Sequence, residues 1–209
     1  IVASGEIVPG EQPPGMVGSD TLAAQLRDAN FDESVKAVVL RIDSPGGGVV
    51  PSQEIHDAIQ RFRNKSKKTV IASMGTVAAS GGYYIAVATD RIMANSGTLT
   101  GSIGVIMEMA NVEGLLKKIG VEGVVIKSGR FKDVGSPLRK MSDEEQALLQ
   151  SVMDDVHKQF IEAVAEGRGL DVAVAVGADP ATLLAAVGAR TEGQPPAIGR
   201  ERPTRQPGI

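Results

Sequence analysis

The stretch TVAASGGYYIA, residues 76–86, contains one hydroxyl in a setting suited to nucleophilic chemistry. Ser80 follows two alanines and precedes two glycines, between a strand-like and a helix-like segment. A serine attacks a carbonyl when a neighbouring base takes its proton. A serine at a helix start is otherwise commonly an N-cap, whose side chain binds a backbone N–H of the first turn. The residues around Ser80 leave both interpretations open.

The choice of base is narrow in this sequence. His56 and His157 are the two histidines, and both lie in charged, helix-like segments where we expect solvated positions. A Ser-His-Asp triad is therefore not favoured, and lysine is the other base that serine enzymes use. Free lysine titrates at about 10.4, so a lysine base needs apolar surroundings or nearby cations. The expected partner is a lysine beside apolar and hydroxyl groups rather than carboxylates.

A second glycine-rich turn, DSPGGG at residues 43–48, follows a β-branched apolar run. It lacks the GK[ST] ending of a phosphate-binding loop and the spacing of a dinucleotide fingerprint. Consecutive glycines allow backbone N–H groups to turn into a cleft, where they can donate to a developing oxyanion. A simple turn that requires positive φ is the alternative interpretation.

Composition excludes several classes of protein. The chain has 209 residues, 42% hydrophobic and 22% charged, which is typical of a globular protein with one core. A net charge of −3 with scattered lysine and arginine argues against nucleic-acid binding. Cysteine is absent, so we expect no disulfide, no thiolate nucleophile and, with two histidines, no metal or other cofactor. No apolar run is long enough to span a membrane.

The elements that must position these residues alternate along the chain, which predicts an α/β fold. Strands are expected at residues 1–8, 36–44, 67–74, 90–95 and 120–129. Helices are expected at residues 51–65, 83–89, 112–120 and 141–169. In the longest helix, Ser142 and Glu145 have capping-box spacing, and Gly167 or Gly169 is the expected stop.

The two ends of the chain differ from its middle. The sequence opens in a strand-like segment, so we expect a fragment, with any membrane anchor upstream of Ile1. Residues 1–169 are expected to form one domain, and residues 170–209 an atypical tail rich in Ala, Gly, Pro and Arg. In this tail a short helix is predicted at 180–189 and disorder at 190–209. Its composition also suggests a frameshift in GC-rich DNA.

Four segments in this order resemble bacterial signal peptide peptidase A, a family of membrane-associated Ser-Lys proteases. They are LRIDSPGGGVVPSQEI, VIASMGTVAASGGYYIA, IMANSGTLTGSIGV and IKSGRFKDVGSPLRKMSDEE. The resemblance covers roughly residues 1–170, and no family motif is found after the long helix. Together the four motifs are far more specific than any one of them.

The resemblance implies roles for individual residues. Ser80 matches the family's nucleophile, and Lys132, in SGRFKD, matches its general base, whereas Lys127 does not. The backbone N–H groups of Gly47 and Gly81 match the oxyanion donors. Ser102 resembles a hydroxyl that orients the lysine, with an ordinary turn serine as the alternative. Asp133 is expected to point away from Lys132, because a carboxylate would hold the amine protonated.

The resemblance also implies a fold and an activity. The expected fold is the crotonase-like α/β arrangement of stacked ββα units shared with Clp-type proteases. The expected activity is cofactor-free hydrolysis of cleaved signal peptides or other short apolar peptides. A ring-like homo-oligomer is expected, at the extracytoplasmic face of the bacterial cytoplasmic membrane. The alternatives are a silent scaffold of the same family and an acyl-CoA hydratase or isomerase, since fold alone does not determine function.

Overall fold

The computed structural model describes residues 1–170 and 172. The described residues fall into two compact units, and the boundary between them lies between Gly101 and Ser102. The first unit contains residues 1–101, and the second contains residues 102–170 and 172. Each unit has its own architecture.

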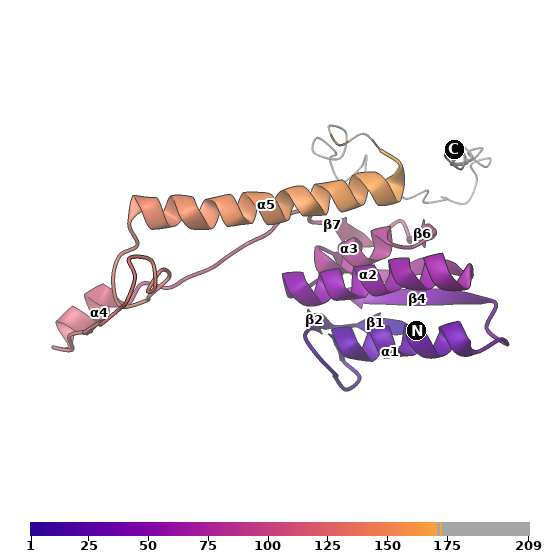
Figure 1. Cartoon of the computed structure of the whole chain (residues 1–209), viewed down its shortest axis with the longest axis horizontal. Helices are drawn as coiled ribbons and strands as arrows, with labels where there is room; N and C mark the ends of the chain where they lie inside the picture. Colours follow the sequence, from indigo (N-terminus) through magenta and orange to yellow (C-terminus); the bar gives the residue numbers. More distant parts are fainter. Residues whose placement is uncertain (171, 173–209) are drawn as a thin grey trace. The chain divides into compact units, whose positions relative to one another are not determined.

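A parallel sheet forms the framework of the first unit (Figure 1). Its strands are β1 (Val2–Ser4), β4 (Ala37–Ser44), β5 (Thr69–Ala79), β6 (Arg91–Met93) and β7 (Leu99–Gly101). The order is β1-β4-β5-β6, and β7 pairs with the last residues of β5. A separate parallel pair consists of β2 (Glu6–Val8) and β3 (Met16–Gly18).

Among its described residues, the first unit also has three helices: α1 (Ser19–Phe31), α2 (Val49–Ser66) and α3 (Gly81–Val87). Helix α2 packs against both α1 and α3. Along β4 the side chains of Val38, Leu40 and Ile42 are buried, and the residues between them are exposed. This alternation places one face of the strand in the core, because successive strand side chains point to opposite faces.

The predicted α/β class is confirmed, and most predicted elements of the first unit are present. The strand expected over 36–44 is β4, and the helix expected over 51–65 is α2. The strand expected over 67–74 was predicted too short. Strand β5 continues to Ala79 because its last residues pair with β7. The turn after this strand therefore begins only at Ser80.

Helices α4 (Glu113–Lys118) and α5 (Asp143–Arg168) are the regular elements of the second unit's described residues. The predicted capping box starts α5: Ser142 Oγ accepts from the Glu145 N–H, and the Glu145 side chain accepts from the Ser142 N–H. Gly169 ends the helix in the left-handed conformation, with φ at 62°. Both ends of this helix agree with the sequence.

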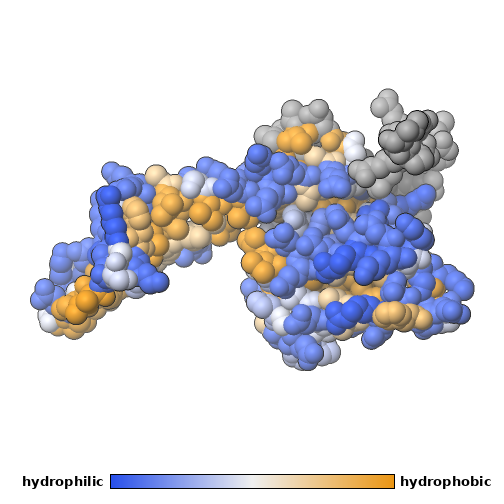
Figure 2. Space-filling view, in the orientation of Figure 1, coloured by the Kyte–Doolittle hydropathy of each residue, from blue (hydrophilic) through white to orange (hydrophobic). Residues whose placement is uncertain are grey.

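The strand predicted over 120–129 was wrong, because this segment is neither strand nor helix. A strand needs a partner strand, and the described residues of the second unit contain no strand that could pair with this segment. Apolar side chains of this unit are instead exposed, among them Ile106, Val124 and Ile126. Figure 2 shows hydrophobic surface over α4 and along part of α5.

No helix of the described residues meets the length and hydropathy needed to cross a bilayer. The predictions for 180–209 lie outside the described residues.

Candidate active site

Ser80 lies at the turn between β5 and α3, in an unusual backbone conformation. Its φ of 51° and ψ of −123° are rare for a residue with a side chain. The Ser80 N–H donates to the Gly101 carbonyl at 2.9 Å, and the Ser80 carbonyl accepts from the Tyr84 N–H at 2.9 Å. These two bonds hold the strained turn in place. Such sharp strand-to-helix turns present the nucleophile in α/β-hydrolases.

The helix-cap interpretation of Ser80 does not hold. Ser80 occupies the N-cap position of α3, but its side chain makes no capping hydrogen bond. An N-cap serine normally has extended backbone angles and binds the second or third N–H of the helix. Ser80 is half-buried, and its hydroxyl does not cap the helix.

The second glycine turn lies directly against Ser80. A Cβ atom on Gly46 would come 2.7 Å from the Gly81 nitrogen and 2.9 Å from the Ser80 Cβ. The φ of Gly46 is also positive, at 104°. Only glycine therefore fits, and it brings the turn after β4 against the turn after β5.

Hydrogen bonds tie the second glycine turn to β2 on either side of Gly47, and Gly81 begins α3. Ile7 of β2 donates to the Gly46 carbonyl at 2.8 Å and accepts from the Gly48 N–H at 2.9 Å. In parallel pairing, the residue between two such bonds directs its own N–H to the opposite side. Gly81 is the first residue of α3, so its N–H has no partner within the helix.

Polar groups that sequence reasoning missed support this turn. Asp43 Oδ1 accepts from the Val77 N–H at 3.0 Å, where the register between β4 and β5 shifts. Thr98 donates to the Gly75 carbonyl at 2.8 Å and Thr100 to the Ala78 carbonyl at 2.7 Å. These bonds fix the end of β5 just before Ser80. The only signal in the sequence was that Asp43 lies near the end of a predicted strand.

Lys132 and Ser102 belong to the second unit, whereas Ser80, Gly47 and Gly81 belong to the first. Lys132 is exposed, in a turn where its N–H donates to the Gly129 carbonyl at 3.2 Å. Ser102 is exposed and has a positive φ of 53°. The structure thus groups the nucleophile candidate with the oxyanion candidates, and places the base candidate in the other unit.

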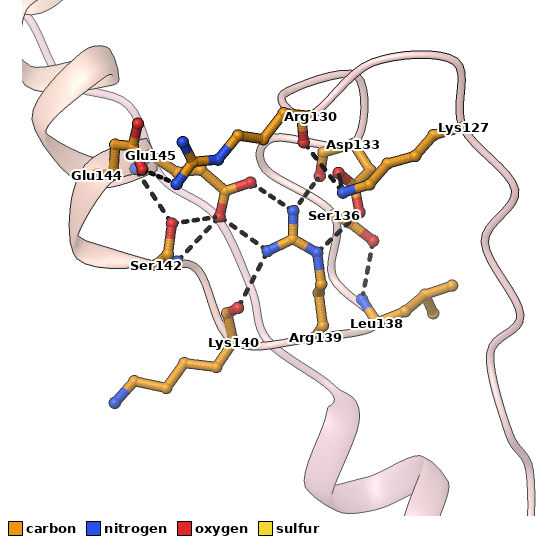
Figure 3. Close-up of polar contacts among 10 residues, drawn as sticks. All are labelled: Lys127, Arg130, Asp133, Ser136, Leu138, Arg139, Lys140, Ser142, Glu144 and Glu145. Atoms are coloured by element: carbon orange, nitrogen blue, oxygen red, sulfur yellow. Dashed lines mark hydrogen bonds and ion pairs between the residues drawn. The ribbon is translucent and has the colours of Figure 1, made fainter.

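Asp133 is bound to cations other than its neighbour Lys132 (Figure 3). Asp133 Oδ1 lies 2.5 Å from Lys127 Nζ, and Oδ2 lies 2.8 Å from Arg139 Nε. The hydrogen bonds from Arg139 and then Lys127 hold the pKa of Asp133 well below its usual range. This agrees with the expectation that Asp133 does not serve Lys132. The Lys127 amine is thus paired with a carboxylate.

Arg139 links Asp133 to the start of α5. Its guanidinium donates to both carboxylate oxygens of Glu145. Hydrogen bonds from Arg139, followed by the Ser142 N–H, lower the pKa of Glu145 to about 2. The two carboxylates in turn raise the pKa of Arg139 above its ordinary value, chiefly through the hydrogen bonds to Glu145. This charged cluster joins the loop that carries Lys132 to the N-terminus of the long helix.

The histidines differ from expectation. His56, on α2, is buried rather than solvated, and its ring packs on Tyr84 with centroids 4.7 Å apart. His157, on α5, is half-buried, with Nε2 3.1 Å from the Ile103 carbonyl oxygen. Among the residues that the structure describes, no cluster of His, Asp and Glu is arranged to hold a metal ion.

Comparison with known families decides the relationship. The sequence profile of peptidase family S49 matches residues 62–192. The chain belongs to this family. The S49 match continues past residue 170, where the resemblance drawn from the motifs stops. The Clp protease profile matches residues 12–109, in agreement with the parallel α/β fold of the first unit. Both matching profiles are named for peptidases.

Individual relatives of this S49 chain carry protease names. A candidate protease of Synechocystis sp. is 49% identical over 160 residues, covering 76% of this chain and 57% of that protein. Protease 4 of Salmonella typhi is 42% identical over 168 residues, covering 80% of this chain and 27% of that protein. A candidate signal peptide peptidase SppA of Enterococcus faecium is 41% identical over 147 residues, covering 70% of this chain and 42% of that protein. The chain therefore spans 57% or less of these relatives.

Proposed function

We propose that this chain carries the catalytic centre of a serine endopeptidase in which Ser80 is the nucleophile and Lys132 the general base. The observation that carries the proposal is the Ser80 turn. Its hydroxyl is held in a strained strand-to-helix connection and is not used as a cap. Strain of this kind persists only where the surrounding structure enforces it, and it gathers at functional sites.

In the proposed reaction Lys132 acts in both halves, first as a base toward Ser80 and then as an acid toward the leaving group. The Lys132 amine takes the proton of Ser80 Oγ as the oxygen attacks the scissile carbonyl carbon. The developing oxyanion accepts hydrogen bonds from the N–H groups of Gly47 and Gly81. The protonated Lys132 then donates its proton to the departing amine, which leaves an acyl-enzyme on Ser80. Water, activated by the same lysine, hydrolyses the ester. Ser102 orients the amine by accepting a hydrogen bond.

The substrates, the assembly and the location are also proposals. The name of the Enterococcus relative supports signal peptides and other short apolar peptides as substrates. Exposed apolar side chains in the second unit support assembly into a ring-like homo-oligomer. The resemblance of the four motifs to signal peptide peptidase A supports a membrane-associated enzyme on the extracytoplasmic face.

The test is to replace Ser80 and Lys132 with alanine, singly and together, and to follow cleavage of a quenched fluorescent peptide of apolar residues. Each single variant should lose on the order of 10³-fold or more in kcat, and the double variant no more than either, because the residues act as a unit. Ser96→Ala and Lys140→Ala are matched controls, since both side chains are exposed. Retention of parental activity by Lys132→Ala would remove Lys132 as the base.

A further inference from the structure

Asp133 closes the loop that carries Lys132. Lys127, before the loop, and Arg139, after it, both bind the Asp133 carboxylate (Figure 3). The Lys127 amine also donates to the Arg130 carbonyl at 3.0 Å, and Arg139 also donates to the Asp133 carbonyl at 3.3 Å. The residue next to Lys132 is therefore fixed from both sides.

A second carboxylate anchors this arrangement to regular structure. Glu145 binds the Arg139 guanidinium through both oxygens and also accepts from the Ser142 N–H at 2.9 Å. The Glu145 side chain is 4% exposed, and that of Asp133 is 11% exposed. Arginine presents a planar, pre-organised fork to carboxylates, which a lysine cannot reproduce. Arg139 thus connects the loop rigidly to the capping box of α5.

The position of Asp133 creates a problem for a base at Lys132. A carboxylate that pairs with an amine favours the ammonium form, which cannot accept a proton. The charged groups that face the Asp133 carboxylate are Lys127 and Arg139, and the nearby Arg130 is paired instead with Glu144. If Arg139 were removed, one oxygen of Asp133 would lose its partner, with Lys132 as its sequence neighbour.

We propose that Arg139 is a positioning residue of the peptidase, which keeps the Asp133 carboxylate engaged and holds the Lys132 loop against the start of α5. This rests on the proposed role of Lys132 as general base. Lys127 assists from the other side of the loop. Arg139 itself touches no reacting atom, so its effect is exerted through Asp133.

The experiment compares Arg139→Gln, Arg139→Lys and the double variant Arg139→Gln/Asp133→Asn with the parent chain. Arg130→Gln is the matched control, since it removes an exposed arginine of the same segment. Three quantities are measured against pH: kcat for the apolar peptide, KM for the same peptide, and the ¹³Cε resonance of Lys132 in lysine-labelled protein. Loss of that resonance in Lys132→Ala assigns it.

Arg139→Gln should raise the titration midpoint of the Lys132 amine, because a carboxylate released from Arg139 favours the ammonium form. It should lower kcat at neutral pH about tenfold or more with little change in KM. The double variant should return the midpoint and most of kcat to the parental values, because the unpaired carboxylate is gone. Arg139→Lys should have a midpoint and a kcat between those of the parent and Arg139→Gln. Arg130→Gln should have the parental midpoint and kcat.

Two results would overturn the inference: a parental midpoint in Arg139→Gln, or a double variant as impaired as the single one. If Arg139→Gln disorders the loop, the double variant still decides, since a merely structural arginine would not be rescued by removal of Asp133. The resonance is observed without turnover. Activity that survives Lys132→Ala would refute the proposed base, whereas the resonance shifts would still test the role of Arg139.

Discussion

At the scale of single residues, the candidate site depends on two backbone conformations that most side chains disfavour. Ser80 accepts a positive φ because Gly101 and Tyr84 bind its backbone, and Gly46 makes room for it by having no side chain. The strain is therefore shared between two turns that are far apart in sequence. A substitution at Gly46 should therefore alter the turn at Ser80.

Gly46→Ala should destabilise the chain by about 1–3 kcal/mol, because alanine disfavours its φ and the new Cβ would contact the Gly81 nitrogen. It should also slow the reaction of Ser80 with a fluorophosphonate probe, since the turn must move. Urea unfolding and probe labelling measure the two effects. Gly97→Ala is the control, because no atom lies within 4 Å of its added Cβ. Equal stability and labelling of both variants would show that the turns are not coupled.

The sequence revealed those parts of the site whose chemistry depends on residue type. Ser80 and the glycine turns could be identified because a hydroxyl and runs of glycine are visible in the sequence. The contact of Gly46 with Ser80 could not be identified from the sequence, since it joins the ends of two strands whose pairing is set by the fold. The buried position of His56 was missed for the same reason: its neighbour Tyr84 comes from another helix.

At the scale of elements, α5 shows which parts of a fold are predictable. Its capping box and its glycine stop involve residues close in sequence, so the spacing of Ser142 and Glu145 was sufficient. The apolar segment 120–129 has strand-like composition, but strand formation depends on a partner that local sequence does not reveal. Arg139 was missed because its two carboxylate partners lie on either side of it in sequence, Asp133 in an irregular loop and Glu145 in the first turn of α5.

Glu145→Gln tests the electrostatic part of this cap. The pKa of Glu145 is about 2, below the value of about 4.3 for an unfolded glutamate. The charged form therefore stabilises the folded chain fully above about pH 5, and this contribution is lost as the pH falls toward 2. Glutamine keeps an acceptor for the capping box but loses the ion pair with Arg139.

Urea unfolding of Glu145→Gln and the parent at several pH values measures the difference. The variant should be less stable than the parent at pH 7 and pH 5, and the difference should shrink below about pH 4. Glu162→Gln, at an exposed position of the same helix, should differ little from the parent throughout. A difference for Glu145→Gln that is the same at acid and neutral pH would exclude the ion pair as its cause.

At the scale of the whole molecule, the distribution of apolar surface is the main observation. Side chains of the second unit are strongly exposed, with Val124 at 82% and Ile126 at 96%. Figure 2 shows that hydrophobic side chains also reach the surface of α5, where Leu148 and Val152 follow each other at helical spacing. Exposed apolar surface of this extent is typical of protein interfaces. We therefore expect this surface to be covered by further copies of the chain.

A site shared between copies would pair Ser80 of one protomer with Lys132 of its neighbour, through a head-to-tail contact that closes into a ring. Mixing inactive Ser80→Ala with inactive Lys132→Ala protein, under conditions that allow subunit exchange, should then restore cleavage of the apolar peptide. In random mixtures of equal amounts, about a quarter of the sites should combine an intact Ser80 with an intact Lys132, because each residue is intact in half of the protomers. Native mass spectrometry establishes that mixed assemblies form. Mixed assemblies without recovered activity would place both residues of each site in one chain.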